Sequence, residues 1–234
     1  MTILELAFAC FLYDRLTKFD RDYFEFRSNT DGSPDLRKSK HRIALIKWLN
    51  KWGCRQFAID YHDKFSMELK KWYEGHIDLL PGNQKYLWEL TENEFDTLGD
   101  LYETLASLTA SEKKRKKGNV IKVTVGPTGA AKILFAIRPN AVAPWDIPIR
   151  NAMKYDGSKK SFLSFLDATR DNLMELGSFC KSGGIDLTSL PVLVGRPESS
   201  VTKLIDEYNW ITLTKGWKLP AAADFKTWFK LQST

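Results

Sequence analysis

The residues best placed to do chemistry lie between positions 126 and 150. Asp146 follows Pro144-Trp145 and precedes Pro148, so rigid neighbours hold one carboxylate at the entrance of a helix that we expect from about residue 149. Two compatible interpretations are open for this carboxylate: it caps the helix, or it stabilises positive charge at a reacting centre. Arg150 follows by four residues, on the same helical face, where it either pairs with Asp146 or contacts a phosphate or base.

A glycine-flanked tetrapeptide precedes this acid in the sequence. Gly126 and Gly129 enclose Pro127-Thr128, and a short apolar helix is expected over residues 130–137. Free N–H groups at such a helix start suit a phosphate, so Gly126, Thr128 and Gly129 are candidate nucleic-acid contacts. A plain turn is the other interpretation. Lys132 is the lysine nearest to this tetrapeptide in the sequence. It is either a catalytic amine or a solvated side chain on an amphipathic helix.

Positive charge is concentrated in one block of the sequence. The chain has 35 Lys and Arg against 29 Asp and Glu, a net charge of +6, and residues 113–117 supply five positive charges. Three interpretations are open: a solvated linker, a patch that contacts phosphates, or a nuclear-import signal. As a candidate nucleic-acid contact, the block consists of Lys113, Lys114, Arg115, Lys116 and Lys117.

Several tryptophans are candidates for stacking on a base. Trp145 adjoins the acid, and Trp210 and Trp217 lie in an aromatic C-terminal segment. Stacking on an aromatic side chain contributes about 1–3 kcal/mol per base. The alternative is that these large side chains are buried in the core.

Composition excludes several classes of protein. With 234 residues, 43% apolar and 13% aromatic, the chain is neither collagen-like nor disordered nor a small disulfide-rich domain. No apolar run approaches the ~18 residues of a membrane span. The three cysteines form no CxxC pair, which favours an intracellular protein, cytoplasmic or associated with a nucleus or nucleoid. The three histidines lack metal-site spacing, so neither a metal nor a cofactor is expected.

The hydrophobic pattern predicts a mainly α protein with little or no sheet. Helical stripes occupy 3–25, 42–53, 57–74 and 91–108 before the basic block, and Gly53 ends the second of them. Thr91 and Glu94 have the spacing of a capping box. Residues 120–125 are β-branched and predict a strand. Further helices are expected at 160–178 and 200–209.

The order of turn, helix, Arg-Pro and Pro-Trp-Asp over about 30 residues resembles the helix-hairpin-helix DNA glycosylases, most of all the 8-oxoguanine glycosylase branch. The resemblance implies a two-lobed helical bundle in which residues 1–234 form one unit. Its approximate lobes are 1–110, a hairpin and catalytic lobe at 118–180, and C-terminal elements at 181–234 that return to the core. It implies a cleft for a flipped-out base, with Asp146 as the carboxylate that stabilises the sugar cation or orients water.

This sequence departs from the family where bifunctional members have a nucleophilic lysine. That lysine follows the second hairpin glycine by two residues, whereas Ala131 stands two after Gly129 and Thr128 two after Gly126. The resemblance therefore implies an N-glycosylase for a modified or damaged purine-like base, DNA favoured, without lyase chemistry. The alternative is a catalytically silent nucleic-acid or nucleobase-binding module of the same fold. Similar proteins encoded beside bacterial antiviral genes extend the expected roles from DNA repair to defence.

Overall fold

The computed structural model describes residues 1–114, 119–221 and 223–224. Helices dominate this part of the chain, and the sheet within it has two strands. The elements in chain order are α1 (Ile3–Leu16), α2 (Phe19–Asn29), α3 (Ser39–Lys51), η1 (Ile59–Tyr61), α4 (His62–His76), η2 (Ile77–Leu79), η3 (Leu87–Glu89), α5 (Glu92–Ser107), β1 (Thr109–Lys114), β2 (Val120–Thr124), α6 (Gly126–Ile137), α7 (Ile147–Ala152), α8 (Lys159–Ser182), η4 (Leu187–Ser189), α9 (Leu190–Leu193), α10 (Val201–Asn209) and η5 (Trp210–Thr214). The prediction of a mainly α protein is confirmed.

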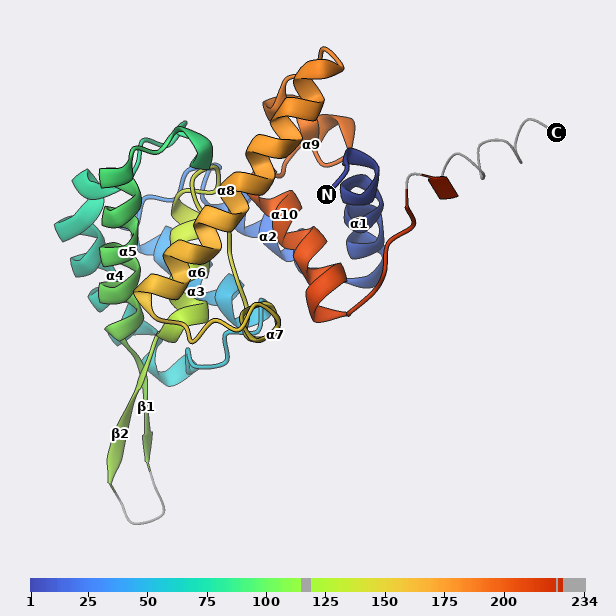
Figure 1. Ribbon diagram of the computed structural model, residues 1–234. Helices are drawn as coiled ribbons and strands as arrows, with labels where there is room; N and C mark the ends of the chain where they lie inside the picture. The colour runs from blue at the N-terminus through green and yellow to red at the C-terminus, as the bar shows by residue number, and fades with distance from the viewer. Residues whose placement is uncertain (115–118, 222, 225–234) are drawn as a thin grey trace.

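The helices form two groups, and α8 runs along both of them (Figure 1). One group holds α3 to α6, and the other holds α1, α9, α10 and η5. Helix α1 therefore packs against α10 and η5 rather than with the helices that follow it. The first helix thus joins C-terminal elements from almost the other end of the chain, and the lobes expected at 1–110, 118–180 and 181–234 stay a prediction.

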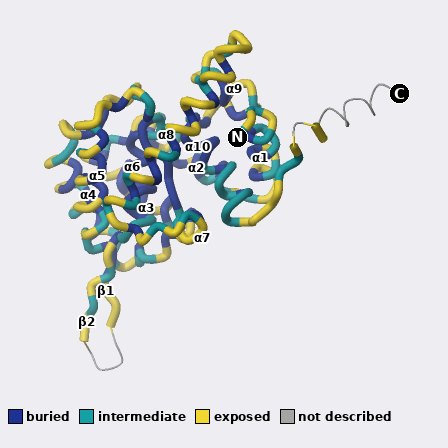
Figure 2. The backbone as a smooth tube through the Cα atoms, viewed as in Figure 1, coloured by how far each residue is buried: buried dark blue, intermediate teal, exposed yellow. Residues whose placement is uncertain are grey.

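Helix α6 is the most deeply buried element of the first group (Figure 2). Residues 129–137 are all buried, and helices α3 and α5 pack against it. An almost uninterrupted apolar run such as Ile133-Leu134-Phe135-Ala136 suits a helix that is surrounded on all sides. Since α6 is fixed from every side, any side chain that it presents to a cavity is held in a defined position.

The start of α6 differs from the sequence prediction. Residues 126–129 were expected to form a turn before a helix at residue 130, but α6 begins at Gly126 and these residues form its first turn. Gly126 has φ +66°, which bends the chain sharply from β2 into the helix. Pro127 follows within the first turn, where its missing N–H costs nothing.

The predicted strand at 120–125 is confirmed as β2, and it pairs antiparallel with β1. Lys113 and Lys114, expected in a loop or helix end, lie in β1 opposite Ile121 and Val120. The ribbon projects from the body at the end of the molecule where α7 lies (Figure 1). Arg115, Lys116 and Lys117 lie outside the described residues. Across the described ranges, no helix is long and apolar enough to cross a membrane.

Candidate active site

The structure brings Asp146 and Lys132 to the same cavity. This cavity has a volume of about 260 Å³, close to the lower end of the range for small-molecule sites. Seven elements or their ends form it: α1, α2, α3, α6, the start of α7, α10 and η5. The lining residues are Tyr13, Phe19, Trp52, Gly53, Thr128, Lys132, Asp146, Ile147, Pro148, Asp206 and Trp210.

Asp146 is the N-cap of α7, as the sequence predicts. Its Oδ1 accepts a hydrogen bond of 2.9 Å from the backbone N–H of Ile149, which fixes the carboxylate at the helix entrance. Within the described part of the chain, Oδ2 has no hydrogen-bond partner, and the residue is only partly buried. One oxygen therefore holds the side chain in place while the other remains available to a molecule in the cavity.

Thr128 and Lys132 lie one helical turn apart on the same face of α6. This face lines the cavity, so both side chains reach it. The Nζ of Lys132 donates a 2.6 Å hydrogen bond to the carbonyl oxygen of Trp52 and lies 5.4 Å from the centre of that ring. A carbonyl acceptor and an aromatic face both favour an ammonium group. Lys132 is thus placed as a fixed positive charge in the cavity wall.

A second carboxylate, which the sequence analysis missed, lies in the same cavity. Asp206 comes from α10, and its side chain is 13% exposed. The pKa of Asp206 is raised to about 6, mainly by burial; the nearby negative charge of Asp146 acts in the same direction, and the charges of Lys203 and Lys132 oppose the shift. Two carboxylates in one cavity, in different surroundings, are a common basis for acid–base chemistry.

Asp206 belongs to a cluster of buried charges, which we call the ion cluster: Asp20, Arg196, Lys203, Asp206 and Glu207. The Nζ of Lys203 is fully buried and lies 3.1 Å from Glu207, 3.2 Å from Asp20 and 3.4 Å from Asp206. Arg196 joins Asp20 and Glu207 at 2.8 and 3.2 Å. The cluster fixes α10 against α2, and it thereby fixes the floor of the cavity.

Aromatic side chains form much of the cavity wall. Trp210 meets Tyr13 edge to face at 5.3 Å, and Trp52 packs against Phe19 at 6.3 Å. These four residues come from segments up to about two hundred positions apart, so no local pattern marks them as a set. Trp210 is the predicted stacking residue that the structure places in the cavity.

Other predicted site residues lie elsewhere. Trp145 is fully buried, its Nε1 donates to the carbonyl oxygen of Pro127, and its ring contacts Tyr102 and Phe165, so it is a core residue rather than a stacking surface. Trp217 is 44% exposed and lies outside the cavity lining. Gly129 is buried where an added Cβ would lie 2.8 Å from the side chain of Gln56, so packing rather than phosphate contact explains it.

In the described part of the chain, Arg150 does not make the first of the two contacts expected for it, the ion pair with Asp146, and its expected contact with a phosphate or base stays a prediction. Among the described residues Arg150 forms no ion pair with Asp146. Its guanidinium lies instead over the ring of Trp145, 5.6 Å from the ring centre. Its buried Nε has no hydrogen-bond partner within the same described ranges. Gly157 makes room for it, because a Cβ there would lie 2.3 Å from Nη1. The guanidinium of Arg150 is therefore held between Trp145 and Gly157, beside the start of α7.

Comparison with known proteins found no match. No family model, curated protein or solved structure matches this chain. Within the described ranges, no group of three His, Cys, Asp or Glu side chains could hold a metal ion. The chemistry assigned to the cavity therefore depends on its own residues.

Proposed function

We propose that this protein is an N-glycosylase-like enzyme that accepts a modified purine-like base of nucleic acid, DNA favoured, in the Asp146 cavity. The single observation that carries this proposal is the free Oδ2 of a helix-capping Asp146 in an aromatic cavity that also holds Lys132 and Asp206. Aromatic walls suit a flat base that has been turned out of its stack, because each face of the base gains a packing partner.

The proposed reaction is hydrolysis of the bond between the base and C1′ of its sugar. As the C1′–N bond breaks, the Asp146 carboxylate stabilises the positive charge that develops on the sugar. Water adds its oxygen to C1′ and loses a proton to Asp146. Asp206, which is protonated below about pH 6, donates a proton to the departing base nitrogen. Lys132 acts as a fixed charge and forms no covalent bond in this scheme.

A binding module without catalysis is the second candidate function. The observation that favours it is that Asp146 and Lys132 each have a structural contact, to the N–H of Ile149 and to the carbonyl of Trp52. The two functions are distinguished by incubating the protein with oligonucleotides that bear oxidised, deaminated, alkylated or deazaguanine-type bases. Free base detected by mass spectrometry supports the enzyme. Salt-dependent binding with no release supports the module.

The pH dependence of base release tests the role of Asp206. Only the neutral carboxyl group can donate a proton, and this form is lost as pH rises through the pKa of about 6. We therefore expect the rate of base release to fall about tenfold per pH unit above pH 6 in the native protein. In Asp206→Asn the rate is expected to be lower at pH 5.5 and nearly independent of pH between 6 and 8. An unchanged pH profile in the variant would exclude Asp206 as the acid.

The exposed lysines of the projecting ribbon are expected to contact nucleic-acid phosphates. Replacing Lys113 and Lys114 with Gln removes two exposed charges from β1. We expect the slope of log K against log salt to decrease in magnitude by about 2, since each phosphate contact contributes about 0.9. The control replaces Lys70 and Lys71, an adjacent lysine pair on helix α4 rather than on the ribbon, each of which forms an ion pair within that helix. Equal slopes for the native protein and the β1 variant would leave the ribbon without a role in binding.

A further inference from the structure

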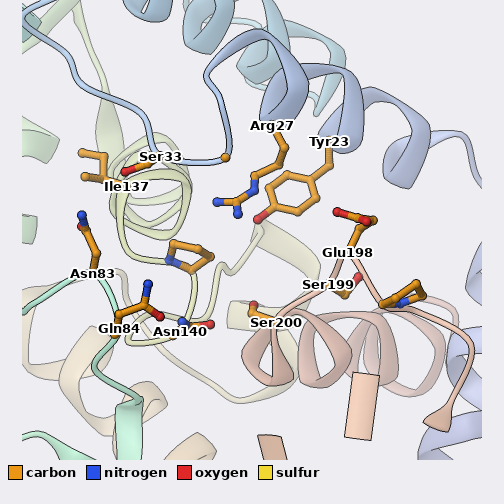
Figure 3. Close-up of a pocket in the computed structure, with 13 residues that line it drawn as sticks. Tyr23, Arg27, Ser33, Asn83, Gln84, Ile137, Asn140, Glu198, Ser199 and Ser200 are labelled. Carbon is orange, nitrogen blue, oxygen red and sulfur yellow. The ribbon is translucent and has the colours of Figure 1, made fainter. Parts of the chain in front are cut away.

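A second cavity, of about 300 Å³, lies at the C-terminal end of α2 and the N-terminal end of α10. Figure 3 shows its side chains converging from four segments that are distant in the sequence. Tyr23 and Arg27 come from α2, Asn83 and Gln84 from the loop before η3, Asn140 from the loop after α6, and Ser199 from the segment before α10. The lining is mostly polar, in contrast to the aromatic wall of the Asp146 cavity.

Arg27 is the charged group at the centre of this cavity. Its guanidinium points into the space beside the hydroxyl of Tyr23 (Figure 3). Among the described residues, neither the guanidinium nor this hydroxyl has a hydrogen-bond partner, and Arg27 forms no ion pair. A half-buried guanidinium gains most from a charge-assisted, bidentate contact, so its natural complement is a phosphate or a carboxylate.

Helix α10 adds positive potential at the same place. Its first turn leaves the N–H groups of Val201 and Thr202 without partners inside the helix. Ser199, which lines the cavity just before this turn, is only 9% exposed, and within the described chain its Oγ has no hydrogen-bond partner. An unsatisfied buried hydroxyl beside a helix start and an unpaired guanidinium together indicate an anionic ligand.

The other wall presents amide side chains. Asn83, Gln84 and Asn140 lie across the cavity from Arg27 (Figure 3). An amide offers a donor and an acceptor in one plane, which matches the hydrogen-bonding edge of a nucleobase. Glu198 is exposed at the rim, where its carboxylate can accept from sugar hydroxyls but would repel a phosphate. The guanidinium of Arg27 attracts the phosphate to its side of the cavity, which leaves the base facing the amides (Figure 3).

We propose that this second cavity binds a nucleoside 5′-monophosphate. Arg27, the Tyr23 hydroxyl and Ser199, which lies just before the N-terminal end of α10, hold the phosphate. The amide side chains contact the base. The site is separate from the Asp146 cavity, because the ring of Tyr23 packs against Trp52 at 5.8 Å and Trp52 lines the other cavity. The inference does not depend on the proposed glycosylase activity.

Isothermal titration calorimetry tests the proposal directly. The probes are AMP, GMP, CMP and UMP, with adenosine, ribose 5-phosphate and inorganic phosphate as partial ligands. We expect at least one monophosphate to bind more tightly than each partial ligand. Arg27→Met is expected to weaken that binding at least tenfold, whereas Arg21→Met is expected to leave it unchanged. Arg21 is the matched control because it lies on the same helix, carries the same charge and is 71% exposed.

Several outcomes would overturn the proposal. Equal affinity for adenosine and AMP would show that the phosphate does not contribute to binding. Equal affinity for inorganic phosphate and all monophosphates would show that the base does not contribute. Binding lost in Asp146→Asn but kept in Arg27→Met would place the ligand in the other cavity. Absence of binding by every monophosphate would end the proposal. Should Arg27→Met fail to fold, Gln84→Ala at an exposed position is expected to weaken binding severalfold, and unchanged affinity there would contradict the assignment.

Discussion

Asp146→Asn is expected to slow base release by about 10²–10³-fold, the typical effect of removing one preorganised electrostatic group from a reacting centre. The change keeps an oxygen that can accept from the Ile149 N–H, so the cap of α7 is preserved. It removes the negative charge that stabilises the sugar cation. Affinity for the nucleic acid and the unfolding temperature are therefore expected to remain close to those of the native protein.

The matched control for this variant is Asp186→Asn. Asp186 is also a helix N-cap, since its side chain accepts from the N–H of Thr188, and it lies outside the cavity lining. Single-turnover release measured by mass spectrometry is expected to be normal in this control. If Asp146→Asn released base at the native rate, Asp146 would be only a helix cap and the catalytic assignment would be wrong.

Lys203→Met is expected to lower the free energy of unfolding by about 3–5 kcal/mol, the usual cost of removing one partner from a buried ion pair. The fully buried ammonium lies within 3.4 Å of three carboxylates and 4.2 Å from the centre of the Tyr13 ring. Without it, Asp20, Asp206 and Glu207 keep Arg196 as the remaining cation of the ion cluster. Methionine fills a similar volume, so the loss is electrostatic rather than a cavity effect.

Denaturant unfolding at two pH values separates this effect from simple packing loss. Burial raises the pKa of Glu207 above its ordinary value and that of Asp206 to about 6, so in the variant these carboxyls take up protons as pH falls. Their protonation relieves the uncompensated charge, and the destabilisation is expected to be smaller at pH 5 than at pH 8. Lys181→Met, at an exposed position in the last turn of α8, is the control and is expected to change stability by less than about 0.5 kcal/mol. A loss under 1 kcal/mol in Lys203→Met at pH 8 would contradict the account.

Local features of the fold could be predicted from the sequence because their causes are local. The Thr91 and Glu94 capping box starts α5 as expected, and the stripe that ends at Gly53 forms α3. Asp146 was predicted as a helix cap from its proline-rich setting, and it caps α7. In each case a short-range hydrogen bond or steric restriction determines the structure, so neighbouring residues are sufficient.

The cavity depends on contacts that no local pattern encodes. Tyr13 and Asp206 meet because α1 packs against α10, and neither segment indicates this partner. Strand β1 was missed because 109–114 is mostly polar and gains its structure by pairing with β2. For Trp145 the sequence left base stacking and burial in the core both open, and tertiary packing among aromatic rings buries it completely.

In the proposed reaction water, and not a lysine, replaces the base in the Asp146 cavity. Its most direct test is to incubate the purified protein with the panel of modified oligonucleotides in the presence and absence of borohydride, measuring free base and any protein linked to the strand. If water is the nucleophile, free base is released from at least one substrate and no borohydride-trapped adduct forms. A trapped adduct would contradict the proposed reaction by making Lys132 or another amine the nucleophile, and binding without release from any substrate would contradict it by making the cavity a binding site alone.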